Sequence, residues 1–562
     1  MTRLPLVLVC VLAFTLGCGD SGGSRQLSAS IVYTEFGVPH ITADSWAGLG
    51  FGQGYAYAQE NFCVLMREIV ASNGQAARYF GEDRAADDFV LTWLNEEEAF
   101  EEYVGGLSDN ARALYQGYAE GFNMVLEERG VDGLPEGDAG CRGAEWVRPI
   151  TESDLVKRSR KLILASGTSA FAGLIIAASD AAPTASMASA QTLGPQSVAL
   201  DLSEIEFAKH RFGSNAYAVG TAGSQTGRGI LLGNPHFPWA GPERFFVKHL
   251  TIPGEYDVFG GSLHGAPFVM IGFNKDLAWS HTTSTSPRFS FYELELLEDD
   301  PFRYRFDDEV REIEAVPVTI EVMLEDGTIE EQTKNIYLSH YGPILDLAAF
   351  NGLVGGWPTL AGTAFTYRDA NIDNARFADQ FVQMGQSSSI GELEEALANI
   401  GLPWVNTTAA DRNGDGFYGD ITTAANIPEE KLNDCAEGLA GLVASFGFPA
   451  LNGSRSACAW DNDPGAPEGL FSFENLPKLR TSDEVPYVGN ANDSYWLANP
   501  NQPLEGFSPV MGGERTQRSL RTRQLFVQGE ERLAGTDGLS ETPGFTVDLM
   551  REIMYGNRNL GA

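Results

Sequence analysis

The stretch HRFGSNAYAVG, residues 210–220, decides how the rest of the chain is interpreted. In it a Gly-Ser-Asn triplet stands directly before a strand-like run, and such triplets most often form turns or caps. The other interpretation is that the chain is cut between Gly213 and Ser214. That cut would make Ser214 a new N-terminus and a nucleophile at the start of a strand. The remaining sequence must distinguish these two interpretations.

The composition is that of a large folded protein. The chain has 562 residues, of which 43% are hydrophobic and 20% are charged, a balance typical of globular proteins with a sizeable core. Its formal net charge is −38. Because binding to nucleic acid depends on Lys and Arg at the phosphates, so acidic a chain is not expected to bind nucleic acid.

The first residues predict export. An apolar run over residues 4–16 follows a basic residue, has the length of a signal peptide and is too short to span a bilayer. The next residues resemble a bacterial lipoprotein cleavage box: a small residue, then Cys18, then a Gly/Ser tether over 19–29. The match departs from the usual pattern at Thr15, where an aliphatic residue is usual. We therefore expect a protein of the periplasm or cell envelope. A lipid anchor at Cys18 and plain secretion are left as alternatives.

Four cysteines remain outside the leader: Cys63, Cys141, Cys435 and Cys458. An even number in an exported protein favours disulfides over metal or redox chemistry. Cys435 and Cys458 are close in sequence and lie in one irregular segment, so we pair them, and Cys63 is left to pair with Cys141. Neither spacing matches a zinc site.

The chain changes character twice. Apolar residues have helical spacing in the first part, as over 110–130, and strand-like runs such as 245–252 and 268–274 dominate the last part. Between them lies a segment rich in Ala, Ser and Thr, with the composition of a linker, and residues 545–562 again have a helical pattern. The expected parts are a signal peptide (1–18), a tether (19–29), a helical part (30–179), a spacer (180–213) and a strand-rich part (214–562).

A serine at the start of a chain brings its own base. A serine hydroxyl is a poor nucleophile until a base takes its proton. The free α-amine of an N-terminal residue has a pKa of roughly 7.7–8.0, so it can accept that proton near neutral pH. Outside the tether there is no G-x-S-x-G elbow, and no S-x-x-K with its partner motifs, so an ordinary serine hydrolase is disfavoured.

Six motifs in a fixed order carry a family resemblance. The first is FGVPHITADSWAGLGFGQGYAYAQENF at 36–62; FGSNAYAVG, LLGNPHF, MIGFNKDLAWSHTTSTS, NGSRSACAW and NANDSYW follow. Together they resemble the penicillin-acylase family of N-terminal-nucleophile hydrolases over nearly all of the mature chain. The resemblance implies an α+β fold, the four-layer αββα sandwich, and maturation by self-cleavage into α and β chains that remain together as a heterodimer.

The resemblance also implies roles for individual residues. Ser214 matches the nucleophile that cleavage after Gly213 exposes, with its α-amine as the base, acting through a water. His236, in NPHF, lies beside the nucleophile where classical penicillin G acylases have glutamine. Thr283, in SHTTS, matches the backbone N–H donor of an oxyanion hole, and Asn492, in NANDS, matches the side-chain donor. The structural alternatives are a turn for His236 and a cap for Asn492.

One arginine is expected to orient the asparagine and the amine. Arg521, in SLRTR, is the match, but Arg518 and Arg523 are close enough to leave the choice open, and a surface charge is the alternative for Arg521. The acyl pocket is expected to draw on Phe237, Trp239 and Phe245 and on residues of the helical part, with an ordinary place in the core as the alternative for these aromatic residues.

No metal or organic cofactor is expected. Penicillin G acylases hold calcium partly with aspartates after the block that matches AWSHT, but residues 284–294 contain no acidic residue before Glu293. DRNGDGFYGD, from Asp411, has the spacing of the first half of a calcium loop, but position 12 would be Thr422, which cannot supply a carboxylate. Its Asn-Gly and Asp-Gly pairs favour a hairpin turn instead.

These observations predict an amidohydrolase that cleaves small N-acylated substrates. The residues after Thr283 and the histidine at 236 favour the acyl-homoserine-lactone and aculeacin-type acylases, with lipopeptides and β-lactams as further candidates. Members of the family continue well past the position of Arg521, so with its end at Ala562 we expect this chain to be truncated. An inactive homologue that serves as a surface lipoprotein binding module is therefore the alternative.

Overall fold

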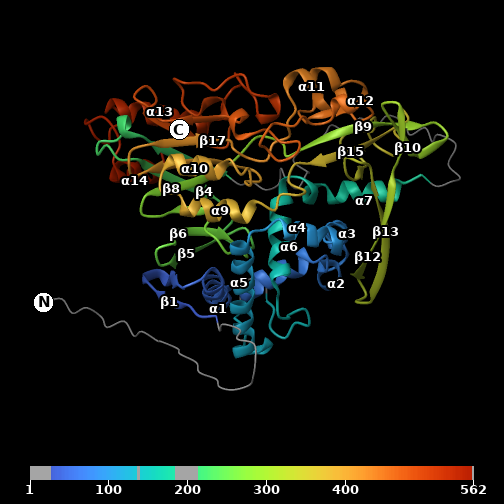
Figure 1. Cartoon of the computed structure of the whole chain (residues 1–562), viewed down its shortest axis with the longest axis horizontal. Coiled ribbons are helices and arrows are strands. Elements are labelled where there is room, and N and C mark those ends of the chain that lie inside the picture. Colours follow the sequence, from blue (N-terminus) through green and yellow to red (C-terminus); the bar gives the residue numbers. More distant parts are fainter. Residues whose placement is uncertain (1–26, 136–139, 184–212, 560–562) are drawn as a thin grey trace.

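The computed structural model describes residues 27–135, 140–183 and 213–559. The predicted signal peptide with Cys18, most of the tether, and residues 184–212 of the predicted spacer lie outside the described residues. Helices dominate up to residue 183 and strands dominate after residue 213, as the change in sequence pattern predicts (Figure 1).

The helices follow the apolar periodicity of the sequence. The helix expected at 110–130 is present: Ser108 caps its start by accepting the N–H of Ala111, and Gly130, with φ 65°, ends it. The α-helices are α1 (Trp46–Ser72), α2 (Ala76–Phe80), α3 (Ala85–Leu94), α4 (Glu97–Gly105), α5 (Asp109–Arg129), α6 (Glu152–Ile163), α7 (Ala172–Ala181), α9 (Phe377–Gln386), α10 (Ile390–Leu397), α11 (Glu429–Cys435), α12 (Gly438–Ser445), α13 (Leu520–Ala534) and α14 (Val547–Tyr555).

Glycines let α1 and α5 pack backbone against backbone. A Cβ at Gly50 would lie 2.2 Å from Leu114 O, and one at Gly54 would lie 2.0 Å from Tyr118 O. These distances are too short for any side chain, so the glycines of the 36–62 motif form a helix–helix contact. The contact fixes α5 against α1, which in turn packs on the largest sheet.

The largest sheet has nine strands. Their order is β1-β2-β5-β6-β7-β8-β16-β17-β19. All neighbours are antiparallel except β2 and β5. The strands are β1 (Ser30–Tyr33), β2 (Pro39–Thr42), β5 (Phe245–Ile252), β6 (Tyr256–Leu263), β7 (Ile271–Phe273), β8 (Leu277–Thr283), β16 (Val405–Asp411), β17 (Gly416–Gly419) and β19 (Lys478–Arg480).

The Gly213–Ser214 segment lies in a three-stranded sheet. Its order is β20 (Tyr487–Asn490), β3 (Gly213–Val219) and β4 (Ile230–His236), all antiparallel. In this register Gly213 pairs with His236, and Ala216 pairs with Asn490. Three motifs far apart in the sequence therefore meet at one end of β3.

The two sheets pack face to face between helices. β3 and β4 lie on β8 and β16 of the nine-stranded sheet. On the opposite face of that sheet, α1 packs on β2 and β5, and α9 packs on β6, beside which it is seen in Figure 1. Helix α13 lies against β20 of the three-stranded sheet. The mixed helix-and-sheet fold is as expected, whereas a complete four-layer sandwich stays a prediction.

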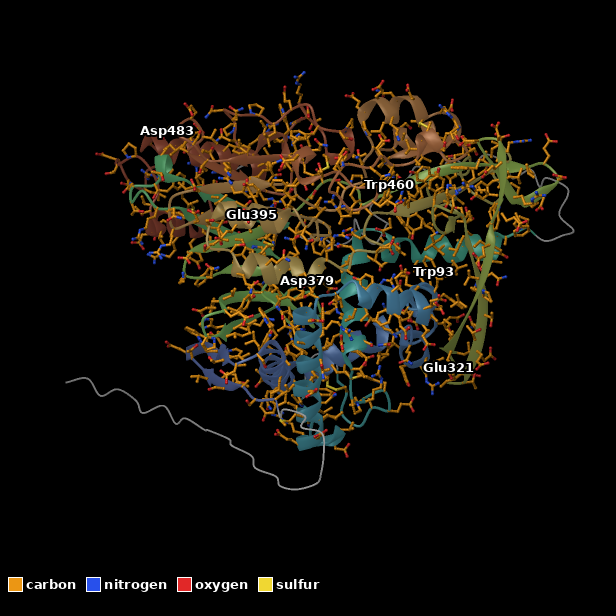
Figure 2. All side chains as sticks on the ribbon, viewed as in Figure 1. Trp93, Glu321, Asp379, Glu395, Trp460 and Asp483 are labelled. Carbon is orange, nitrogen blue, oxygen red and sulfur yellow. A yellow bond between two sulfur atoms is a disulfide. The ribbon has the colours of Figure 1, made fainter. Side chains whose placement is uncertain are left out.

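A third sheet and a long ribbon form the other side of the molecule. Four strands, β11 (Glu309–Glu312), β10 (Asp300–Phe306), β9 (Phe289–Leu297) and β15 (Thr363–Asp369), continue into β14 (Ile344–Leu345), and β18 (Ala450–Asn452) pairs with β9. The ribbon of β12 (Glu314–Met323) and β13 (Ile329–Leu338) lies along α2, α3 and α7 (Figure 1). Two side chains labelled in Figure 2 join segments that are far apart in the sequence: Trp460 donates its indole N–H to Ser290 Oγ on β9 at 2.7 Å, and Asp379 on α9 accepts the N–H of Ser108, before α5, at 3.1 Å.

Local predictions are mostly confirmed. The strand expected at 245–252 is β5, and the final helical pattern contains α14, but of the strand expected at 268–274 only Ile271–Phe273 is a strand. Both disulfides form as paired from the sequence, Cys63 with Cys141 and Cys435 with Cys458. Within the described ranges no single helix is long and apolar enough to cross a membrane, and one bent pair, 152–166 with 168–181, meets that requirement only when its halves are joined.

Candidate functional site

Ser214 is the second residue of β3 and is 1% exposed. Its hydroxyl lies 2.6 Å from the carbonyl oxygen of Gly213, the residue just before it. Its backbone N–H donates to Asn492 Oδ1, also at 2.6 Å. The hydroxyl and the N–H of this serine therefore both have polar partners close to the Gly213–Ser214 peptide bond, at which cleavage is predicted.

Asn492 follows β20 and has a left-handed backbone conformation. Its φ is 65°, which Asn tolerates better than most residues. The turn is held because the N–H of Asn492 donates to Asn490 Oδ1 at 2.8 Å. The Nδ2 of Asn492 lies 3.4 Å from Thr283 O, at the end of β8. The two residues expected to form an oxyanion hole are thus neighbours.

Arg521 connects these groups from the first turn of α13. Its Nη1 donates to Ser214 O at 2.5 Å and to Asn215 Oδ1 at 3.0 Å, and its Nη2 donates to Asn492 Oδ1 at 2.8 Å. Arg518 points elsewhere, because its guanidinium donates to Ser494 Oγ at 3.0 Å. Of the candidate arginines, Arg521 is the one that the geometry favours.

His236 lies beside Gly213 on the neighbouring strand. Its Nε2 is 2.7 Å from Asn234 Oδ1, and since a carboxamide oxygen only accepts, Nε2 carries the hydrogen. That leaves Nδ1 as an acceptor, and a Cβ placed on Gly213 would be 3.1 Å from it. Partial burial and then the charge of Arg521 lower the pKa of His236, so the ring is neutral at neutral pH.

An apolar pocket opens from Ser214. Phe237 and Phe245 line it as expected, but Trp239 is 96% exposed and does not, and the described residues of the helical part contribute none of the lining. Burial lowers the pKa of His281 in its wall to about 4, so the wall carries no charge at neutral pH. The lining residues are Ser214, Phe237, Phe245, Leu263, Met270, Ile271, His281, Thr282, Thr283, Phe377, Phe381, Pro403, Trp404 and Val405.

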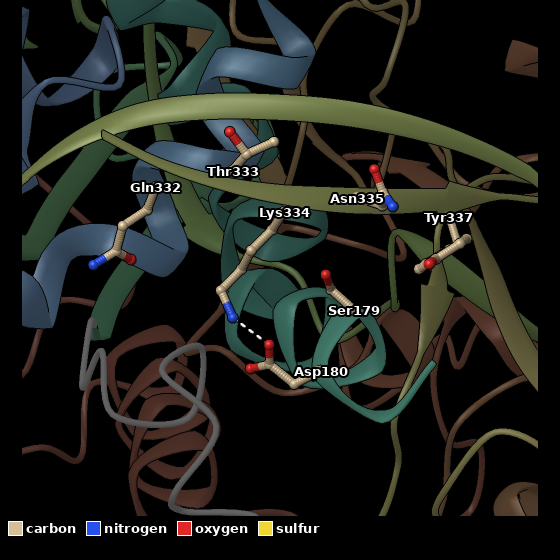
Figure 3. Close-up of a pocket in the computed structure, with 7 residues that line it drawn as sticks. All are labelled: Ser179, Asp180, Gln332, Thr333, Lys334, Asn335 and Tyr337. Atoms are coloured by element: carbon tan, nitrogen blue, oxygen red, sulfur yellow. Dashed lines mark hydrogen bonds and ion pairs between the residues drawn. The ribbon is translucent and has the colours of Figure 1, made fainter. Parts of the chain in front are cut away.

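A larger hollow lies far from these residues in the fold. It is a polar surface between the end of α7 and β13, where Lys334 and Asp180 form an ion pair (Figure 3). None of the predicted site residues lines it. This polar surface is therefore separate from the candidate site around Ser214.

The segment from Asp411 forms a hairpin. β16 and β17 pair across it, and Asp411 Oδ1 accepts the N–H groups of Asn413, Gly414 and Asp415 at 2.9–3.1 Å. Its carboxylate is thus used by the turn, as the Asn-Gly and Asp-Gly pairs suggest. In the part of the chain that the structure describes, no group of three or more His, Cys, Asp or Glu residues is arranged to hold a metal ion.

Comparison with known proteins identifies the family. The sequence model of the family described as penicillin amidase matches residues 28–562. The chain belongs to the penicillin amidase family. It is 40% identical to the acyl-homoserine lactone acylase PvdQ of Pseudomonas fluorescens strain Pf-5 over 526 residues, which cover 91% of this chain and 64% of that protein. It is 38% identical to the aculeacin-A acylase of Actinoplanes utahensis over 549 residues, which cover 95% of this chain and 67% of that protein.

Similarity to solved structures is lower. A thermostable penicillin G acylase from Alcaligenes faecalis is 18% identical, with a TM-score of 0.43 over 60% of this chain and 51% of that one. This chain of the penicillin amidase family spans about 64% of the length of the PvdQ proteins that it matches.

Sequence reasoning missed three asparagines of the site. Asn490 accepts the N–H of Asn492 and so supports its turn. Asn234 accepts a hydrogen bond from His236 Nε2, which fixes the hydrogen on that nitrogen, and Asn215 accepts a hydrogen bond from Arg521. Asn490 had a detectable signal, because Asn commonly bonds the backbone two residues later. Asn234 bonds a side chain two residues later on the same strand, and Asn215 bonds a side chain from α13, so no local backbone pattern marks either residue.

Proposed function

We propose that this protein is an acylase that hydrolyses the amide bond of N-acylated substrates with Ser214 as an N-terminal nucleophile. The observation that carries the proposal is the position of the Ser214 hydroxyl, 2.6 Å from Gly213 O at the mouth of an apolar pocket. The site residues act within the four-layer αββα sandwich that the penicillin amidase family suggests, in the periplasm or cell envelope. The two disulfides favour an oxidising compartment of this kind.

Maturation is an attack of Ser214 on the residue before it. The Oγ of Ser214 bonds to the carbonyl carbon of Gly213, the C–N bond to Ser214 breaks, and the nitrogen takes up the proton that the hydroxyl loses. Water then hydrolyses the resulting ester and frees Ser214 with an α-amine. His236 Nδ1, as an acceptor beside Gly213, is placed to carry the proton. The α and β chains stay together as a heterodimer.

The mature site carries out the same chemistry on a substrate. The α-amine of Ser214 takes the hydroxyl proton through a water, Oγ attacks the amide carbon, and the amine product leaves with that proton. Water then releases the acid. The N–H of Thr283 and the Nδ2 of Asn492 stabilise the oxyanion, and one such donor is worth about 2.7–4 kcal/mol. No step uses a metal or an organic cofactor.

The pH dependence follows from the base. The α-amine must be neutral to act, and its ordinary pKa is roughly 7.7–8.0. A neighbouring positive charge favours the neutral amine, and Arg521 bonds both Ser214 O and Asn492 Oδ1. We expect kcat/KM to rise with pH through the pKa of the amine. A flat profile between about pH 6 and 9 would exclude the amine as the base.

The pocket favours substrates with an apolar acyl chain. Its volume is about 20 Å³. Ordinary ligand pockets occupy about 300–1,000 Å³, so the aromatic walls must move apart when a chain enters. The names of the relatives point to acyl-homoserine lactones and lipopeptides as substrates, with β-lactam side-chain amides as a further class.

Intact mass spectrometry of wild type beside Ser214→Ala tests the proposal. Wild type should separate into two chains, the larger beginning at Ser214, and the variant should stay whole. Wild type should then release the amine from a long-chain acyl-homoserine lactone faster than from the N-acetyl analogue. If wild type is cut and still hydrolyses neither compound, the binding-module alternative is favoured. If neither protein is cut, Ser214 is an ordinary residue of β3 and not a nucleophile.

A further inference from the structure

Asn490 is buried next to the proposed site residues, and both ends of its carboxamide form hydrogen bonds. It ends β20 and is 2% exposed. Its Oδ1 accepts the hydroxyl of Thr282 at 2.7 Å and the N–H of Asn492 at 2.8 Å. Its Nδ2 donates to Asp493 O at 2.8 Å. A buried amide with these partners cannot be replaced by an apolar side chain without leaving polar groups unpaired.

Each partner of Asn490 leads to a different residue of the proposed site. Thr282 immediately precedes Thr283 on β8, and Asn492 is the proposed side-chain donor. Asp493 accepts the hydroxyl of Ser519 at 2.9 Å, and Ser519 caps the helix that carries Arg521. One side chain therefore connects β8, the turn after β20 and the start of α13.

Other buried polar groups close the network. Asn406, on β16, donates through Nδ2 to Thr282 Oγ1 at 3.0 Å and to Thr283 O at 3.3 Å. Tyr418, on β17, donates its hydroxyl to Asn406 Oδ1 at 3.2 Å. Asn406 is 1% exposed and Tyr418 is fully buried. Because water does not reach them, these groups have no alternative partners, and their geometry is well defined.

We propose that Asn490 is a positioning residue that sets the two donors of the oxyanion hole, Thr283 N–H and Asn492 Nδ2, at a fixed separation. The inference rests on the proposed function. Asn490 touches neither the Ser214 hydroxyl nor the pocket, so it acts only through its neighbours. An oxyanion hole needs both donors in place before charge develops, and loosening one support displaces both.

The chain offers a matched control in Asn499. Asn499 is fully buried, its Nδ2 donates to Tyr487 O at the other end of β20, and its Oδ1 accepts the N–H of Asn501 at 2.8 Å. It makes the same kind of turn as Asn490, with no bond to a proposed site residue. Asn490→Ala and Asn499→Ala should therefore lower Tm by similar amounts.

The test compares mature Asn490→Ala and Asn499→Ala. We expect kcat on an N-acyl substrate to fall about 100-fold in Asn490→Ala, with KM changed by less than about threefold, because the lost support acts in the transition state. In Asn499→Ala kcat should stay within about threefold of wild type. Equal kcat in the two variants would overturn the inference while leaving the acylase function intact. Wild type that matures without hydrolysing amides would instead overturn the function.

A second pair covers the case in which Asn490→Ala fails to mature. Thr282→Val removes the hydroxyl that bonds Asn490 with little change in shape, and Thr282→Ser keeps it. We expect both variants to self-cleave, and the mature Val variant to turn over substrate about 10-fold more slowly than the mature Ser variant, which keeps the hydroxyl. Val and Ser variants with the same rates would overturn the inference.

Discussion

Gly213 has little room for a side chain. A Cβ there would lie 3.1 Å from His236 Nδ1 and 3.7 Å from Arg521 Nη1, so the backbone of Gly213 lies directly against both side chains. At the scale of single residues, then, the absence of a side chain is what lets the histidine and the arginine approach the bond at which we propose cleavage.

Replacing Gly213 should therefore slow maturation. Gly213→Ala has to displace the His236 ring by a few tenths of an ångström, and Gly213→Val has to displace it further. We expect self-cleavage to slow by about 10-fold in the Ala variant and more in the Val variant, since small misplacements of reacting groups are costly. A time course of chain separation on denaturing gels measures this. Because Gly213 is not part of the mature nucleophile, material that does mature should have the kcat of wild type.

At the scale of elements, the cap of α13 determines where Arg521 lies. Ser519 accepts the N–H of Thr522 at 3.2 Å and donates to Asp493 at 2.9 Å, which fixes the first turn of the helix against the turn of Asn492. Arg521 leaves from that first turn. The position of the first turn of α13 thus determines where the guanidinium of Arg521 lies.

Ser519→Ala should affect both stability and activity. Loss of an N-cap costs about 0.5–2 kcal/mol of folding free energy, and a frayed first turn no longer holds Arg521 on Asn492. We expect a lower Tm and a kcat reduced by about 10-fold. Thr546→Ala is the control, because Thr546 caps α14 by accepting the N–H of Leu549, away from the site. If the two variants lose Tm and kcat alike, the cap of α13 has no specific role.

Strand β5 carries a lysine into the core. Lys248 is 1% exposed, its Nζ donates to Ala266 O at 2.9 Å, and burial lowers its pKa to about 7. In the unfolded chain its pKa is about 10.4, so between about pH 7 and 10 the unfolded state binds a proton that the folded state does not. The free energy of unfolding therefore increases with pH in that window.

Lys248→Met should be more stable than wild type at pH 7, and its advantage should shrink as the pH rises to 10. The slope of the difference is at most about 1.4 kcal/mol per pH unit. Ala266 O keeps a partner in the variant, because Ser262 Oγ also donates to it at 3.2 Å. Calorimetry of both proteins at four pH values provides the measurement. A difference in Tm that is constant from pH 7 to 10 would show that Lys248 does not titrate in this range.

At the scale of the whole molecule, two disulfides close loops of unequal length. Cys63–Cys141 spans 78 residues of the helical part, and Cys435–Cys458 spans 23 residues near β18. Restriction of the unfolded chain stabilises the folded state by about 4.5 kcal/mol for the longer loop and about 3.4 kcal/mol for the shorter one. The longer crosslink also holds α1 to the segment after α5.

Removing the longer crosslink should lower Tm more than removing the shorter one. The double variant Cys63→Ser/Cys141→Ser is expected to lose more Tm than Cys435→Ser/Cys458→Ser, and both should keep the kcat of wild type, because neither bond touches the site. Calorimetry and the acylase assay measure the two effects. The reverse order would mean that structure retained in the unfolded chain, or strain relieved in the folded one, outweighs loop length.

Much of the fold followed from local patterns. The sequence alone determined the helix at 110–130, the strand at 245–252, the pairing of both disulfides and the order of motifs that marks the family. These features depend on residues near one another in the chain. The disulfide pairing is of this kind, because two of the four cysteines are close in sequence and the other two are then left to pair. The motifs and the SLRTR segment also contain Ser214 and the four residues expected to act with it, and the roles of these residues stay predictions. The four are His236, Thr283, Asn492 and Arg521.

The tertiary structure decided what depends on contacts between distant segments. It places Arg521, and not Arg518, against Asn492, because the start of α13 directs that side chain there. It leaves Trp239 out of the pocket lining, because that residue faces solvent. It also showed Asn490 as the junction of β8, β20 and α13. A hydrogen bond between residues 208 positions apart leaves no periodic trace in the sequence. It exists only once two sheets have packed face to face and excluded the water that would otherwise satisfy those groups.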